Sequence, residues 1–146
     1  MAIIVLTDHA GIGCAGWVLR SIFADTAAVL LEQGHAQLAD WMNSEECMPI
    51  LVSHFDARGL TKRNQAAFNE AFLIAYSRTA ELGMAGWPGD PASWKGYFQL
   101  ISSLEHQLRM EQAGEPVSTH KNLSEIWKYD GTTEGPGWAA PLNRDE

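Results

Sequence analysis

The feature that most constrains the fold is a long amphipathic segment between Asp90-Pro91 and Gly114. Aspartate is a favoured N-cap, proline suits the first helical position, and glycine accepts the left-handed conformation just past a helix end. Between these signals, apolar residues recur at steps of three and four, which predicts a single helix of about 23 residues, or about 34 Å. The apolar stripe consists of Trp94, Tyr97, Phe98, Ile101, Leu104 and Leu108.

Further helices are predicted by similar signals. Thr61 is a suitable N-cap for a second long helix that stops at Gly83, and the Gly- and Pro-rich connection 83–89 predicts that the two long helices form an antiparallel hairpin. A third segment, closed by Gly34, is apolar on nearly every side, which indicates a central helix. The expected helices besides 91–113 are 62–82, 15–33, 35–42 and 49–58.

The segment 49–58 has a second interpretation. Its apolar run Ile50-Leu51-Val52 could instead form a buried strand beside the extended segment Ile3–Leu6. Short helices and buried strands share this pattern, so periodicity does not separate them. We favour the helix and keep the strand as the alternative.

These elements predict an all-α, single-domain bundle of four to five helices with a short N-terminal extended segment and an irregular C-terminal tail. A length of 146 residues suits one hydrophobic core. The expected division is a helical domain at 1–116 and a tail at 117–146 that packs on it, because glycines and prolines cluster at 131–141.

The compartment is predicted to be the cytoplasm. No stretch reaches the roughly 18 uninterrupted apolar residues of a membrane span, and the N-terminal segment lacks the basic start of a secretory signal. Two cysteines are too few for a disulfide scaffold, and a cytoplasmic setting implies that Cys14 and Cys47 are free thiols, which we expect to pack as small hydrophobic residues.

The charge of the chain is unevenly distributed. The net charge is −8, and the range 21–57 holds six acidic residues and no Lys or Arg. Such a balance argues against direct nucleic-acid binding and is typical of either a solvated acidic face or a docking surface for a basic protein. Trp87 and Trp138 lie in Gly/Pro-rich loops, where a tryptophan either packs the loop against the domain or anchors a partner. The expected partner-binding residues are Asp25, Glu32, Asp40, Glu45, Glu46, Asp56, Trp87 and Trp138.

Cofactor and metal patterns are weak. Gly11-x-Gly13-x-x-Gly16 matches a dinucleotide fingerprint, but Thr7–Ala10 separates it from the preceding apolar run by more residues than that turn allows. Glu32 and His35 have a metal-site spacing, yet bundle metal sites need two such pairs. We therefore expect no cofactor and no metal.

Three functional hypotheses remain. The first is a cytoplasmic binding protein that captures a basic protein partner through the acidic region, for example a neutraliser of a toxin or nuclease of the immunity-protein or inhibitor kind. The second is a small enzyme with a pocket near Asp8, His9 and Cys14, since a carboxylate tunes a neighbouring histidine for acid–base work. The third is a structural subunit that forms homo-oligomers through its apolar stripe.

Overall fold

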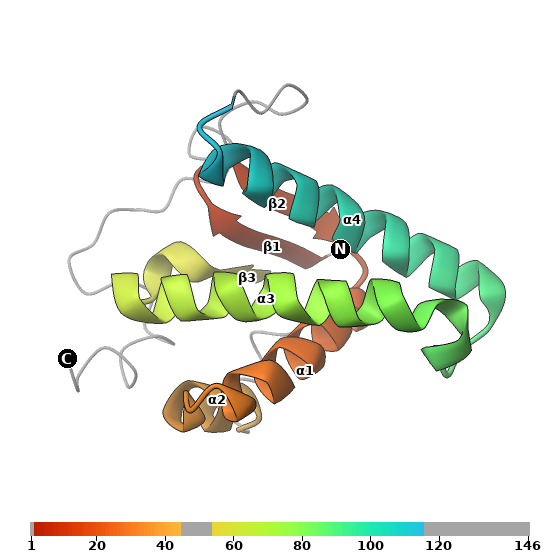
Figure 1. Cartoon of the computed structure of the whole chain (residues 1–146), viewed down its shortest axis with the longest axis horizontal. Helices are drawn as coiled ribbons and strands as arrows, with labels where there is room; N and C mark the ends of the chain where they lie inside the picture. The colour runs from red at the N-terminus through yellow and green to blue at the C-terminus, as the bar shows by residue number, and fades with distance from the viewer. Residues whose placement is uncertain (1, 45–53, 116–146) are drawn as a thin grey trace.

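The computed structural model describes residues 2–44 and 54–115, which form a mostly helical domain with a small three-stranded sheet (Figure 1). The elements are β1 (Ala2–Thr7), β2 (Ala10–Cys14), α1 (Gly16–Glu32), α2 (Ala36–Met42), β3 (His54–Asp56), the 3-10 turn η2 (Ala57–Gly59), α3 (Lys62–Leu82), the 3-10 turn η3 (Gly83–Gly86) and α4 (Pro91–Gln112). The predicted helical character is confirmed, whereas the all-α class is too simple because of the sheet. The expected tail, 117–146, lies outside the described residues.

The sheet is built around β1, which lies between antiparallel β2 and parallel β3. Ile4 pairs with Ile12 on one side and with Phe55 on the other, and its side chain is fully buried. A central strand covered on both faces is expected to be a continuous apolar run, as Ile3–Leu6 is. The predicted extended segment is thus the centre of a sheet.

The favoured helix over 49–58 is wrong for its described part. His54–Asp56 is strand β3 beside β1, and a 3-10 turn follows. The alternative strand was expected at 50–52, which the structure does not describe. Phe55 is 1% exposed and packs edge-on against Phe23 of α1 at 4.7 Å between ring centroids. Burial against residues far away in the sequence decides the local structure here, and a short apolar run does not show which residues will cover it. Residues 49–53 lie outside the described ranges.

The two long helices begin and end where their signals predict. The side chains of Thr61 and Asp90 accept hydrogen bonds from the backbone N–H groups of Asn64 and Ser93, at 3.1 and 2.7 Å. Gly83 ends α3 with φ of +61°, a conformation that favours glycine. The helices meet at η3 and diverge toward their other ends, where the sheet lies between them (Figure 1). The predicted antiparallel hairpin is confirmed.

The predicted central helix is α1. It packs against α3, α2 and β1 through buried residues that lie on one side of the helix. Ala24, Ala28 and Leu31 on its other side are exposed, so α1 is less enclosed than its apolar sequence predicts. Gly34 follows it with φ of +85°, and α2 starts two residues later. The position of α1 matters for the site below, because it places Asp25 against α4.

Candidate functional site

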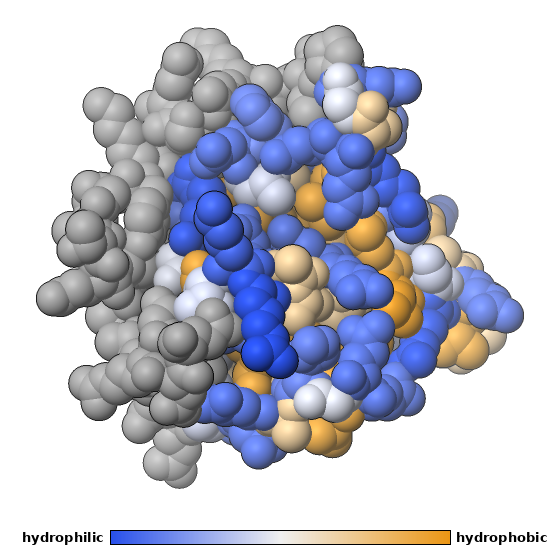
Figure 2. Space-filling view, turned by 60° about the vertical axis from the view of Figure 1, so that its left-hand side comes forward, coloured by the Kyte–Doolittle hydropathy of each residue, from blue (hydrophilic) through white to orange (hydrophobic). Residues whose placement is uncertain are grey.

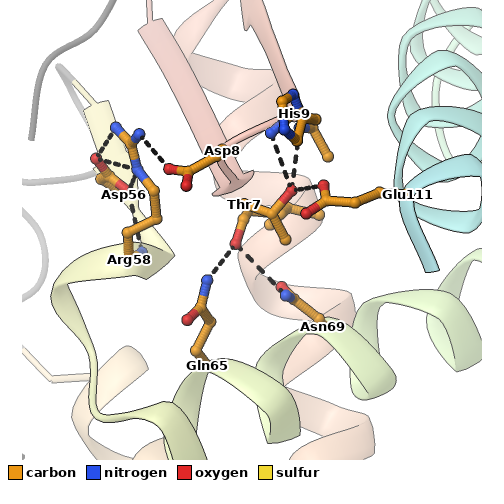
Figure 3. A network of polar contacts seen from close by, with 10 residues as sticks. Thr7, Asp8, His9, Asp56, Arg58, Gln65, Asn69 and Glu111 are labelled. Carbon is orange, nitrogen blue, oxygen red and sulfur yellow. Dashed lines mark hydrogen bonds and ion pairs between the residues drawn. The ribbon is translucent and has the colours of Figure 1, made fainter. Parts of the chain in front are cut away.

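The turn between β1 and β2 carries the first candidate residues. Asp8 and His9 are exposed at this turn, which is held by the Thr7 hydroxyl: its oxygen accepts hydrogen bonds from the backbone N–H groups of His9 and Ala10 at 3.3 and 3.1 Å (Figure 3). The same hydroxyl donates to the carboxylate of Glu111 on α4. The turn is therefore fastened to the helix through Thr7.

An ion-pair cluster lies beside this turn (Figure 3). The Arg58 guanidinium donates to both carboxylate oxygens of Asp56, at 2.9 Å from Nε and 2.7 Å from Nη2, and to Asp8 at 3.0 Å from Nη1. The hydrogen bond to Asp56 is the main cause that raises the pKa of Arg58. Asp56 is 9% exposed. It belongs to an internal clamp between β3 and η2 and does not contribute to an exposed acidic surface, contrary to our expectation.

Polar side chains of α3 and α4 hold the sheet in the same region. Gln107 accepts the backbone N–H of Gly11 at 2.9 Å, and Gln65 and Asn69 donate to the carbonyl oxygen of Leu6 at 2.8 and 3.4 Å. A groove of about 650 Å³ runs between the helices here. It is lined by Thr7, Lys62, Gln65, Ala66, Asn69, Glu70, Leu73, Leu108, Glu111 and Gln112. These bonds tie backbone groups of the sheet to the helices, which is a structural role.

The residues of the enzyme hypothesis do not come together. Cys14 pairs with Ala2 at the far end of β2, roughly 13–16 Å from the turn at the 3.3 Å rise of a strand. Its thiol is buried, and burial raises its pKa, which disfavours the nucleophilic thiolate. Asp8 and His9 are not among the residues that line the groove at Thr7.

The cofactor and metal patterns have structural explanations. Gly11 and Gly13 lie inside β2 and pair with β1, so they form no turn that leads from a strand to a helix N-terminus. α1 ends at Glu32, before His35. Among residues 2–44 and 54–115, no three His, Cys, Asp or Glu side chains are grouped so that they could hold a metal. No helix in these ranges is long and apolar enough to cross a membrane.

The remaining acidic candidates differ in their surroundings. Glu32 is exposed and forms an ion pair with Arg78 of α3, and Asp40 is exposed on α2. Asp25 is exposed but accepts a hydrogen bond from the Tyr97 hydroxyl of α4 at 3.2 Å. Partial burial is the largest influence on the pKa of Asp25 and raises it, while the bond from Tyr97 opposes the shift. Glu45, Glu46 and Trp138 lie outside the described residues.

Trp87 is fixed at the end of the helical hairpin. Its indole N–H donates to the hydroxyl of Ser93 at 2.9 Å, and that hydroxyl donates to the carbonyl of Asp90, the N-cap of α4. Its ring stacks on Tyr97 with centroids 4.9 Å apart and an interplanar angle of 22°. A Cβ at Gly89 would lie 2.8 Å from the indole nitrogen, so this close approach needs glycine. The half-buried Trp87 thus packs the loop against α4.

Asp25 and Trp87 share one recess. It has a volume of about 280 Å³ and lies between α1, α4 and the end of α3. Trp94 also lines it, with its ring centroid 5.8 Å from that of Trp87, and Tyr97 forms its buried floor. The full lining is Ser21, Ala24, Asp25, Thr79, Leu82, Gly83, Gly86, Trp87, Pro88, Trp94 and Tyr97. Two residues expected to contact a partner for separate reasons thus lie in one cavity.

Two further residues of this recess are predicted by the sequence pattern as core residues only. Trp94 and Tyr97 belong to the apolar stripe of α4, and Tyr97 is indeed 2% exposed. Their additional contact with Trp87 depends on how the loop folds back, which no spacing shows. Large exposed apolar residues adjoin the recess: Trp17 is 38% exposed with its ring 6.2 Å from Trp87, and Leu82 is 66% exposed. The described part of the face in Figure 2 is mostly blue, with orange apolar groups between the hydrophilic residues.

A comparison of the chain with known protein families, characterised proteins and solved structures finds no match.

Proposed function

We propose that this protein is a binding module that captures a basic protein partner, with the recess of Asp25 and Trp87 at the centre of the contact. One observation carries the proposal: an exposed carboxylate and fixed tryptophan rings line the same open cavity. Aromatic anchors in a pocket supply most of the binding energy of many interfaces, and complementary charge adds orientation and a faster encounter.

The charge of the whole chain supports a basic partner. A net charge of −8 attracts cationic surfaces over several ångströms, and Asp40 on α2 is a further exposed carboxylate. Neutralisation of a basic toxin or nuclease, as by an immunity protein or inhibitor, is one form this capture takes. A cytoplasmic setting is part of the proposal, and the free thiol of Cys14 agrees with it.

The test is affinity capture from the lysate of the source cells, with elution by a rising salt concentration. Three baits are compared: the wild type, Asp25→Asn, and Glu70→Gln as the matched control. Glu70 is an exposed carboxylate that lines the groove at Thr7 and not the recess. We expect a stoichiometric basic protein that elutes at clearly lower salt from the Asp25→Asn bait and at unchanged salt from the control. Retention that is the same on all three baits would refute the proposal.

A further inference from the structure

The recess combines a carboxylate with aromatic faces in a cavity of side-chain size. Trp87 and Trp94 are both half-buried, and their rings are inclined to each other by 54°. A volume of about 280 Å³ lies just below the range of small-molecule pockets, which is roughly 300–1,000 Å³. The recess therefore suits one inserted side chain better than a large ligand.

The charge of the recess determines which charge a bound side chain should carry. Among the described residues that line it, Asp25 carries the only formal charge. The other polar groups are hydroxyls and backbone groups, and the walls are apolar or aromatic. Cations are attracted to the faces of tryptophan rings as well as to carboxylates, so both parts of the recess favour the same ligand.

We infer that the recess receives an arginine side chain of the basic partner, with the guanidinium stacked on Trp87 beside Trp94 and hydrogen-bonded to the Asp25 carboxylate. This inference rests on the proposed function, because the arginine belongs to the captured protein. It names the chemical group that the recess recognises.

Arginine fits better than lysine for three reasons. The guanidinium is planar, so it stacks on an aromatic ring while its edge remains free to donate hydrogen bonds. It is more weakly hydrated than an ammonium group, so it loses less on entering a partly buried cavity. Its forked donors can reach both oxygens of one carboxylate. One oxygen of Asp25 accepts the Tyr97 hydroxyl, which holds the carboxylate toward α4.

The experiment uses the whole chain and three capped tripeptides, Gly-Arg-Gly, Gly-Lys-Gly and Gly-citrulline-Gly. Binding is followed by the NMR shift of the Trp87 indole N–H, assigned with a tryptophan variant. Citrulline has nearly the shape of arginine but no charge. We expect the arginine peptide to bind at least about tenfold more tightly than the citrulline peptide and several-fold more tightly than the lysine peptide. Equal affinity of the arginine peptide and either of the others would overturn the inference.

Two variants locate the binding. Asp25→Asn should weaken the arginine peptide about tenfold, whereas the control Glu70→Gln should leave its affinity unchanged. Gly89→Ala should weaken it several-fold without any change in charge, because the new Cβ displaces the indole of Trp87. Thermal melting confirms that each variant is folded. Unchanged affinity in Asp25→Asn would place the peptide elsewhere and refute the inference.

The outcome separates this inference from the proposed function. If a basic protein is captured in an Asp25-dependent way while the arginine peptide does not bind preferentially, the proposed function stands and the arginine assignment falls. If the arginine peptide binds in the recess and no basic protein is captured, the proposed function falls and the recess is a guanidinium site for another ligand.

Discussion

Replacement of Arg58 by methionine is expected to destabilise the fold strongly. Its side chain is 9% exposed and donates to both oxygens of Asp56, which is itself buried, and to Asp8. Methionine keeps much of the apolar stem but leaves the Asp56 carboxylate without its cation, and loss of one partner of a buried pair costs about 3–5 kcal/mol. Asp56 still accepts the backbone N–H of residue 58, at 3.0 Å in the wild type, so we take the lower end, about 3 kcal/mol.

The assay is thermal and urea unfolding at neutral pH. At 2–4 °C per kcal/mol for a domain near this size, a loss of about 3 kcal/mol lowers Tm by roughly 6–12 °C. Asp8→Asn is the matched comparison: the Asp8 side chain is 59% exposed, so its removal should cost under about 1 kcal/mol. The double variant Asp56→Asn with Arg58→Met should be more stable than the sum of the single effects predicts. A Tm within 2 °C of the wild type for Arg58→Met would refute the argument that this clamp holds β3 to η2.

Three further outcomes are expected. In a Cys47→Ser background, Cys14 should react with a thiol reagent only as fast as the protein unfolds, because its thiol is buried and its pKa is raised; rapid reaction in the native state would contradict this. Thr26→Val should raise the free energy of unfolding by up to about 1 kcal/mol, measured in urea, because the buried Thr26 hydroxyl has no hydrogen-bond partner among the described residues; a clear loss of stability would show that the hydroxyl is satisfied. Burial raises the pKa of Asp25, so the folded state binds the carboxyl proton more tightly than the unfolded chain does. The wild type should therefore lose stability relative to Asp25→Asn as pH rises from about 4 through the raised pKa, as measured by urea unfolding at several pH values. A difference between the two proteins that does not change with pH would contradict the shift.

The sequence predicted the helices because their end signals act locally. Asp90 and Thr61 satisfy backbone N–H groups only three residues away, and Gly83 and Gly34 take left-handed conformations at the ends they mark. A cap and the N–H group that it satisfies lie within one helical turn, so no tertiary information is needed to recognise them. The bounds of α3 agree residue by residue with the expectation for 62–82.

The sheet could not be predicted in the same way. β2 contains two glycines in five residues, a composition depleted in strands, and it is a strand because it pairs with β1 and is covered by α4. β3 has three residues, and its pairing partner, β1, lies about 50 positions earlier in the chain. Strand identity in such short segments is decided by pairing and burial, which depend on residues far away.

Which carboxylates are available to bind a partner also could not be predicted from the sequence. A count of carboxylates in 21–57 treats Asp56 and Asp25 alike, yet Arg58 holds the first inside the fold, whereas α1 presents the second beside α4. Trp87 lies 62 positions after Asp25 and reaches it only because η3 returns the chain onto α4. The capacity of an acidic protein to bind a basic partner therefore depends less on its net charge than on which carboxylates the fold leaves unpaired by internal cations. In the described residues of this chain, the carboxylate that combines exposure, aromatic walls and a charge disfavoured by burial is Asp25, so the proposed interaction depends on that residue more than on the acidic region as a whole.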